Sequence, residues 1–202
     1  MDVTAPSDGR LADALAAIDA ANAADPHTIV VDGVERPKEL AHAEMMTGWV
    51  RRLSPGCSAH QIIAARAHHL RRWAIPRESF PKDRAGYLRW RSALRRQHAE
   101  DVGAIMRAAG YGDEAIGRVQ AIVRKQGLGR DPEVQVHEDA LCLVFLETQF
   151  DDLTADLDDE EKMIDILRKT AAKMSPAALE AALGLPYSPA GAALLERALA
   201  PR

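Results

Sequence analysis

The pattern of apolar and polar positions indicates helices along almost the whole chain. Apolar residues recur at intervals of three or four, as Leu11, Leu15 and Ile18 do, so they lie on one helical face. Turn or capping signals separate these stretches, and no internal repeat is present. The pattern predicts helices over 10–23, 36–53, 58–73, 83–109, 113–127, 132–150 and 159–174, followed by two short helices that start at Ser175-Pro176 and Ser188-Pro189.

One segment breaks the helical pattern. Two short β-branched runs flank Asp32-Gly33, a dipeptide typical of tight turns between strands. We therefore expect a short β-hairpin near residues 28–36, or an extended loop in the same place. The predicted fold class is all-α: a flexible tail over 1–9 and one domain over 10–202, built as a bundle of about eight to ten helices.

Two helix starts carry specific local signals. Ser58 and Gln61 have the spacing of a capping box, in which each side chain bonds the other residue's backbone N–H. Asp131 is followed by Pro132, the preferred pairing for the cap and the first residue of a helix.

Composition supports a helical, globular protein. Hydrophobic residues make up 47% and charged residues 28%, while aromatic residues make up only 4%, which favours closely packed helices over a β-sandwich. The two cysteines, Cys57 and Cys142, cannot build a disulfide framework or a cysteine-rich zinc site. No apolar run resembles a signal core or a membrane span. We expect a cytoplasmic protein without membrane contact.

The charges are segregated along the chain. Residues 51–96 hold twelve basic and two acidic side chains, whereas residues 131–165 hold thirteen acidic and one basic, in a chain of net charge −4. A local basic segment in an acidic protein favours a small anionic ligand over a nucleic acid. Two solvated helix faces, or ion pairs between the two segments, would explain the same pattern.

Histidines group around the predicted turn at 54–57. Leu53 and Ser58 flank that turn. His42 lies eleven residues before Leu53 and His69 eleven residues after Ser58, each about 16 Å along its helix at 1.5 Å per residue. If the two helices are antiparallel, His42 and the His68-His69 pair lie at one height. Imidazoles so placed can bind a divalent metal ion.

A carboxylate would complete such a set of ligands. Glu138 and Asp139 lie in the middle of the apolar helix predicted over 132–150, where a charged side chain faces solvent or needs a partner. Either could join the histidines on one divalent ion, which we expect to be Zn, Mn, Fe, Ni or Co.

Arginines follow the histidine pair. Arg71 and Arg72 follow His69 by two and three residues. Arg84 begins the next long helix, and Arg91 lies two helical turns further along the same face. Guanidinium groups bind phosphate with paired hydrogen bonds. These four arginines predict a phosphorylated small molecule or a nucleotide as ligand. Single-stranded nucleic acid is disfavoured, because the net charge is negative and no nucleic-acid-binding motif is present.

Segments spread over nearly the whole chain share features of one family. They are Ile18–Asn22, Pro37–Leu40, His69–Arg77, Asp83–Arg91, His98–Glu100, Asp131–Gln135, Glu138-Asp139 and Ile166–Thr170. Together they resemble the family called domain of unknown function 4202, whose name implies no reaction.

A second, distant resemblance rests on three places in the chain. His42, the His68-His69 pair at the end of an apolar stretch, and Asp139 resemble the HD-domain metal-dependent phosphohydrolases. Those enzymes have a first His, an adjacent His-Asp pair and a final Asp. The resemblance implies an HD-like helical domain with His42 in the first position, His68 and His69 at the pair and Asp139 in the last. This sequence has His69 where those enzymes have Asp.

The segment from His98 to Gly110 resembles the histidine-bearing helix of the same superfamily. Members with several metals carry a later His-His pair, where this chain has Lys125-Gln126, so the resemblance implies a single ion. It also implies that His98 or Glu100 moves a proton or supports the metal ligands.

The sequence thus predicts a metal-dependent phosphohydrolase that acts on a phosphomonoester or a nucleotide, with one ion held by His and Asp. The alternative is a non-catalytic module of the same HD-like fold that binds an anionic ligand, nucleic acid or a protein partner. The oligomeric state stays open, and a homo-oligomer is compatible with the Ala-rich helices near the C-terminus.

Overall fold

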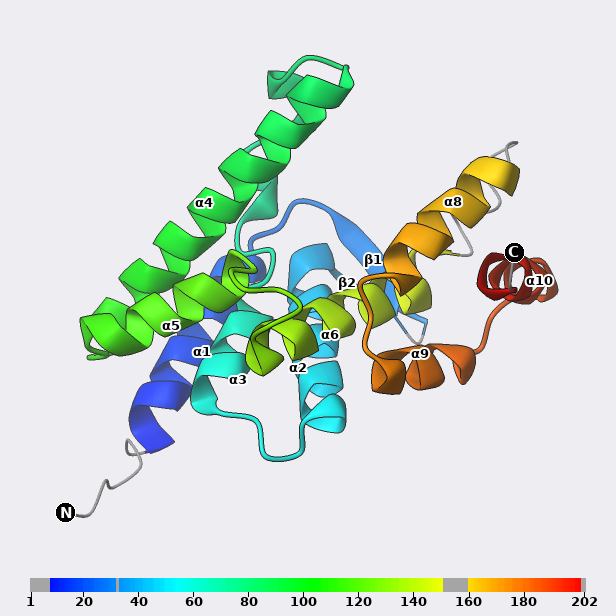
Figure 1. The fold of residues 1–202 in the computed structure, drawn as a ribbon. Coiled ribbons are helices and arrows are strands. Elements are labelled where there is room, and N and C mark those ends of the chain that lie inside the picture. The colour runs from blue at the N-terminus through cyan, green and yellow to red at the C-terminus, as the bar shows by residue number, and fades with distance from the viewer. Residues whose placement is uncertain (1–7, 32, 151–159, 201–202) are drawn as a thin grey trace. The chain divides into compact units, whose positions relative to one another are not determined.

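The computed structural model describes residues 8–31, 33–150 and 160–200 (Figure 1). Within these residues it contains nine α-helices and one two-stranded sheet, which confirms the all-α class with a short hairpin. The chain forms two compact units, residues 1–126 and 127–202. That residues 10–202 form one domain remains a prediction. Most of the expected tail lies outside the described residues, and α1 already begins at Asp8.

The first unit holds the hairpin and five α-helices in its described part. Its elements are α1 (Asp8–Asn22), β1 (Thr28–Val31), β2 (Val34–Pro37), α2 (Lys38–Leu53), α3 (Ala59–Arg66), the 3-10 helices Arg72–Ala74 and Arg77–Ser79, α4 (Arg84–Ala108) and α5 (Asp113–Val123).

Helix α3 is central to the first unit, because it packs against α1, α2 and α5, while α4 packs on α5 and α1 (Figure 1). The side chains that fill this core are fully or almost fully buried, among them Ile18, Met46, Ile63, Met106 and Ile122. Burying each such side chain contributes about 1.5–3 kcal/mol. The helices that carry the site residues described below are therefore held by a continuous apolar core.

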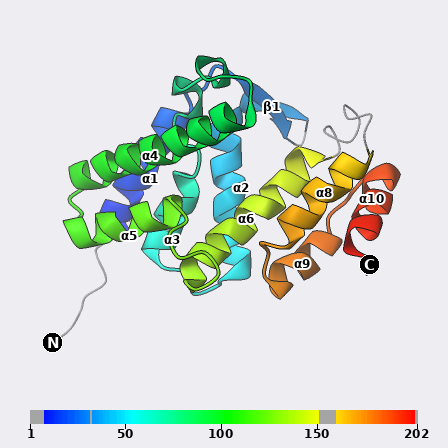
Figure 2. The same cartoon turned by 45° about the horizontal axis from the view of Figure 1, so that its top comes forward.

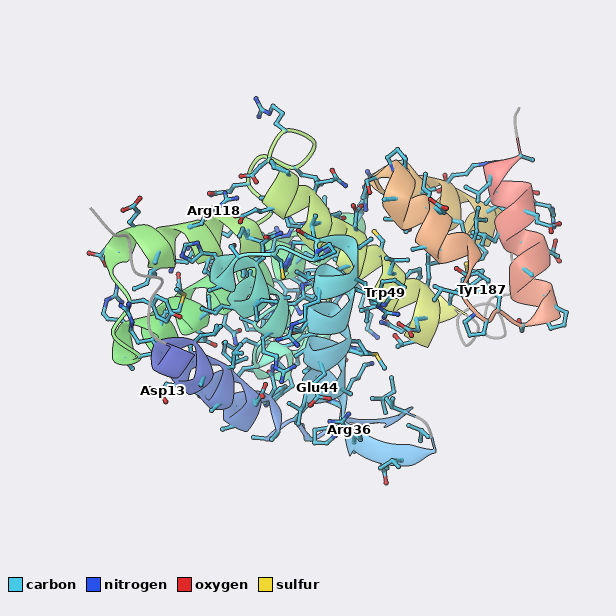
Figure 3. The ribbon with its side chains drawn as sticks, turned by 90° about the horizontal axis from the view of Figure 1, so that it is seen from below. Asp13, Arg36, Glu44, Trp49, Arg118 and Tyr187 are labelled. Atoms are coloured by element: carbon cyan, nitrogen blue, oxygen red, sulfur yellow. The ribbon has the colours of Figure 1, made fainter. Side chains whose placement is uncertain are left out.

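The hairpin predicted near residues 28–36 is confirmed. Its antiparallel register pairs Thr28 with Pro37 and Val31 with Val34. Gly33 adopts a φ of 78° at the turn, a conformation that glycine takes without steric cost. An ion pair of 2.7 Å between Arg36 on β2 and Glu44 on α2 joins the hairpin to the following helix (Figure 3).

Several predicted helix starts are confirmed. Ser58 and Gln61 form a complete capping box on α3. Asp83 accepts a hydrogen bond from the backbone of Gly86 at the start of α4, and Asp131 accepts two at the start of the helix that follows it. Each of these caps is worth about 1 kcal/mol. Local sequence therefore fixes the N-terminal ends of these helices.

The second unit contains the remaining described helices. Helix α9 lies beside α6, and α10 packs on α8 (Figure 2). The side chains of Phe150 and Tyr187 meet edge to face, with ring centroids 5.6 Å apart. The acidic residues 151–159 lie outside the described part of the chain. The bounds are α6 (Pro132–Thr148), α8 (Glu160–Ala171), α9 (Pro176–Leu183) and α10 (Pro189–Leu199).

The helix predicted over 58–73 is wrong in its second half. Helix α3 ends at Arg66, and His68 and His69 lie in a turn instead. Backbone bonds of the i to i+3 type tighten the chain here, and Arg71 takes the left-handed conformation with a φ of 52°. No glycine or proline marks this turn in the sequence, so the apolar pattern gave no stop signal.

We expect Gly86→Ala to destabilise the first unit by more than about 2 kcal/mol. A Cβ at Gly86 would lie 2.1 Å from the carbonyl oxygen of Pro81, a backbone atom that cannot move aside alone. Denaturant unfolding measures the loss. Gly117→Ala is the matched control, because Gly117 lies in α5 with no atom within 4 Å of the added carbon. Equal stability of the two variants would contradict the close approach.

Every helix within the described residues is too short or too polar to cross a lipid bilayer.

Candidate metal centre and adjoining pocket

The first turn of α2 is fixed by the loop before the hairpin. The carboxylate of Asp25 accepts hydrogen bonds of 3.0 Å from the backbone N–H of Glu39 and of His27. The backbone N–H of Lys38 donates to the carbonyl of His27 at 2.9 Å. Pro37 has no side-chain group that can cap the helix, so the carboxylate of Asp25 accepts a backbone bond of the first turn instead. These hydrogen bonds fix the start of α2 and with it the position of Glu39.

Three side chains of the first unit converge next to this turn. Glu39 and His42 lie one helical turn apart on α2 and are both buried. The turn after α3 brings His69 to them, with its Nδ1 at 3.1 Å from Oε2 of Glu39. The Nδ1 atom of His42 lies 3.7 Å from the same oxygen. One ligand atom from each of the three lies within 4.8 Å of the other two.

The charges in this group suit a cation. Burial raises the pKa of Glu39, but His69 and His42 outweigh that effect, so the carboxyl pKa lies well below its ordinary value. Burial lowers the pKa of His69, although the nearby carboxylate of Glu39 opposes the shift. The group therefore favours an ionised carboxylate and a neutral imidazole, which are the forms that bind metals.

The donor set fits a divalent transition metal. Two imidazoles and one carboxylate form ligand sets for Zn and for non-haem Fe, and Mn, Co and Ni accept the same atoms. The Nε2 atom of His42 is buried and has no hydrogen-bond partner among the described residues. A buried nitrogen of this kind normally has a partner, so a bound cation or water would satisfy it.

Sequence reasoning found two of these three residues. It named His42 and His69 as ligands but missed Glu39, for which it proposed Glu138 or Asp139. A signal for Glu39 was present, because it precedes His42 by three residues and so shares its helical face. Glu138 and Asp139 drew the prediction to α6 because they interrupt an apolar helix, whereas Glu39 stands in a polar stretch of sequence.

The other predicted histidines lie beside the group. The ring of His68 stacks on that of His69, with centroids 3.8 Å apart, and the ring of His98 lies 5.9 Å from His69. The Nδ1 atom of His98 is 2.8 Å from the carbonyl of Leu70, so it carries a proton and donates it. Burial and the proximity of His69 lower the pKa of His98 to about 3. Glu100 is exposed on α4.

Glu138 and Asp139 belong to the second unit, where both are buried in α6. Oδ1 of Asp139 accepts a 2.9 Å hydrogen bond from the backbone of Ser175 and another of 2.9 Å from the side chain of Gln135. Asp139 thus joins α6 to the start of α9. Its role as a metal ligand, like that of Glu138, stays a prediction from sequence.

We expect Asp139→Ala to cost about 1–3 kcal/mol of stability, whatever the fate of a metal. The substitution leaves the partly buried backbone N–H of Ser175 without its acceptor. Asp139→Asn is the control, because the amide oxygen can still accept that bond. Urea unfolding of both variants measures the difference. If Asp139→Ala were as stable as Asp139→Asn, the hydrogen bond between Asp139 and the start of α9 would make no contribution to stability.

A pocket of about 300 Å³ is lined by Glu39, one of the three ligand residues. It is formed entirely by the first unit, between the start of α2, the segment 72–78 and Trp90 on α4. Its volume is at the lower end of the range for small-molecule sites. Its lining residues are Asp25, His27, Lys38, Glu39, Arg72, Trp73, Ile75, Pro76, Arg77, Glu78 and Trp90.

The predicted phosphate-binding arginines separate in the structure. Arg72 lines the pocket and its Nε lies 3.8 Å from Oε1 of Glu39. Arg71 and Arg84 are exposed, and Arg91 is half-buried against the ring of Tyr87. Arg77, which the sequence prediction did not include, lines the pocket with Arg72.

The two arginines of this pocket lie against aromatic rings. Arg72 lies 4.8 Å from the ring centroid of Trp90, and Arg77 lies 6.0 Å from both Trp90 and Tyr87. The indole N–H of Trp90 donates to the carbonyl of Ile75 at 2.8 Å, which fixes the ring. Stacking on fixed rings limits how far the two guanidinium groups can move.

The fold and this site define a class: an α-helical protein with a His–His–Glu group suited to a divalent metal and a basic pocket beside it. A family model described as Domain of unknown function (DUF4202) matches residues 12–195. The chain therefore belongs to this family. No curated protein and no solved structure matches the chain.

Proposed function

We propose that this protein is a divalent-metal-dependent phosphohydrolase that acts on a phosphomonoester or a nucleotide. The group Glu39, His42 and His69, with ligand atoms within 4.8 Å of one another, supports the proposal most directly. The distant resemblance to HD-domain phosphohydrolases, in which His42 and His69 occupy metal-binding positions, agrees with it. At such a site a divalent ion would act as a Lewis acid towards a phosphoryl oxygen and would make a water molecule more acidic.

The protein's own residues would place and neutralise the substrate. Arg72 lines the pocket and contacts Glu39 and His69, so its guanidinium can pair with phosphoryl oxygens of a ligand there. Lys38 and Arg77 add positive charge to the same pocket. These groups would stabilise the negative charge that develops on a phosphoryl group during transfer.

In this proposal His98 is a positioning residue. It is neutral at physiological pH, because its pKa is lowered to about 3. Its hydrogen bond to the carbonyl of Leu70 holds the turn that presents His69. Glu100 is exposed, so we assign it no part in the reaction.

A second candidate function is a non-catalytic module that binds an anionic ligand. His69 is already bonded on both nitrogens, since Nδ1 faces Glu39 at 3.1 Å and Nε2 lies 3.4 Å from Arg72. Glu39, His69 and Arg72 therefore form a row of hydrogen bonds in which both ring nitrogens of His69 have partners without a metal ion. In such a module the pocket would bind a phosphorylated molecule and leave it unchanged.

Metal analysis and a phosphatase screen distinguish the two. Purified protein is stripped with a chelator, reloaded separately with Mn, Co, Ni, Zn or Fe(II), and assayed on phosphorylated metabolites and nucleotides. Stoichiometric metal and phosphate release with at least one ion would support the hydrolase. Protein that binds no ion, or that releases no phosphate with any of them, would favour the binding module.

A further inference from the structure

The carboxylate of Glu39 is shared between two neighbours of different kinds. Its Oε2 faces the imidazoles of His69 and His42, at 3.1 and 3.7 Å. Its Oε1 faces the guanidinium of Arg72, at 3.8 Å. The side chain is only 6% exposed, so water screens these interactions weakly. A change of charge near Oε2 will therefore change the electrostatic interaction of Glu39 with Arg72 at Oε1.

Arg72 depends on Glu39 for its negative partner. Among the described residues, Glu39 is the carboxylate within ion-pair distance of Arg72. The other contacts of the guanidinium are Nε2 of His69 and the face of Trp90, neither of which carries negative charge. If the charge of Glu39 were neutralised, Arg72 would need another anion.

The pocket offers a place for that anion. Lys38 lines it with no ion-pair partner among the described residues, and Arg77 is held there by hydrogen bonds to the carbonyls of Phe80 and Pro81. The carboxylate of Asp25 is already occupied by two backbone N–H groups. Glu78 is a further carboxylate of the lining, and it is exposed to solvent. Arg72, Lys38 and Arg77 bring three cationic donors to the pocket, and such donors bind oxyanions.

We propose that this pocket binds a tetrahedral oxyanion through Arg72 and Lys38, and that a divalent cation at Glu39 strengthens this binding. The inference rests on the proposed function for its metal site. The cation would neutralise the charge of Glu39. The guanidinium of Arg72 would then pair with the anion in place of Glu39. By linkage the anion strengthens cation binding by the same factor, which for coupled sites is about 5–150-fold.

The first arm of the test needs no metal. Sulfate is titrated into chelator-treated protein at constant ionic strength, with tryptophan fluorescence or calorimetry as the readout. Glu39→Gln removes the charge but keeps an oxygen for His69, so it should bind sulfate at least about fivefold more tightly than the unchanged protein. Arg72→Gln should lose sulfate binding. Arg89→Gln, on the exposed face of α4, is the matched control and should behave as the unchanged protein.

The second arm measures Mn²⁺ affinity with and without saturating sulfate. We expect sulfate to tighten Mn²⁺ binding in the unchanged protein and to have no effect in Arg72→Gln, which still holds the three metal ligands. Sulfate binding that is absent, or equal in Glu39→Gln and the unchanged protein, would overturn the inference. Two ligands that bind without coupling would also overturn it. If Mn²⁺ fails to bind while Glu39→Gln tightens sulfate, the anion pocket is supported and the metal-dependent function is not.

Discussion

Replacing His69 by alanine is expected to lower metal affinity, and with it phosphate release, by more than about 100-fold. Residues that only support a metal ligand are worth ten- to a hundredfold in affinity, so loss of a ligand should exceed that range. His69 also bonds Glu39 at 3.1 Å and its side chain is 23% exposed, so its removal opens the group without emptying a large core volume. A metal-competition titration measures the affinity, and initial rates at one fixed metal concentration, below saturation of the unchanged protein, measure the phosphate release.

His60→Ala is the matched control for this substitution. His60 lies on α3, outside the group of three, and is half-buried like His69. It should keep both affinity and rate within about twofold of the unchanged protein, because surface substitutions usually change energies by less than 0.5 kcal/mol. A His69→Ala protein that folds, binds metal normally and hydrolyses substrate would remove the basis of the proposed function.

The second large effect concerns His98 and acid. The folded-state pKa of His98 is lowered to about 3, below its ordinary value of 6.5, because burial disfavours the charged ring. Protons therefore bind the unfolded chain more readily than the folded one. The contribution to stability is fully present above pH 6.5 and is lost as the pH falls towards 3. Between pH 6.5 and 5 this loss amounts to about 1.5 kcal/mol.

His98→Asn removes this dependence. The asparagine amide can still donate to the carbonyl of Leu70, but it does not titrate. At pH 7.5 the variant should be the less stable protein, and the gap should close by about 2 kcal/mol when both are unfolded with urea at pH 5. Measurements are made with chelator present, so that metal release does not contribute. A gap that is independent of pH would show that His98 is not buried in its neutral form.

Local signals accounted for most of the fold. Three helix starts depend on contacts within four residues, so they can be predicted without tertiary information. They are Ser58 with Gln61, Asp131 with Pro132, and Ser175 with Pro176. The hairpin was predicted on similar grounds, from Asp32-Gly33. Where a short-range hydrogen bond decides the structure, the sequence was sufficient.

The site was harder to predict because distant contacts build it. Asp25 bonds the backbone of Glu39 across fourteen residues, and Glu39 meets His69 across thirty. The turn that carries His68 and His69 includes Arg71 in the left-handed conformation, which a helical pattern cannot reveal. The two histidines were expected on a helix, and only the folded chain shows that a turn presents them.

The stacking of Arg72 on Trp90 gives the protein an intrinsic optical probe. Indole emission responds to nearby charge, and the guanidinium of Arg72 lies 4.8 Å from this ring. Of the three tryptophans in the chain, Trp73 also lines the pocket, whereas Trp49 is buried under Arg52 on α2. Unlabelled protein should therefore signal occupancy of the pocket by itself, which suits it to ligand screening before any substrate is identified.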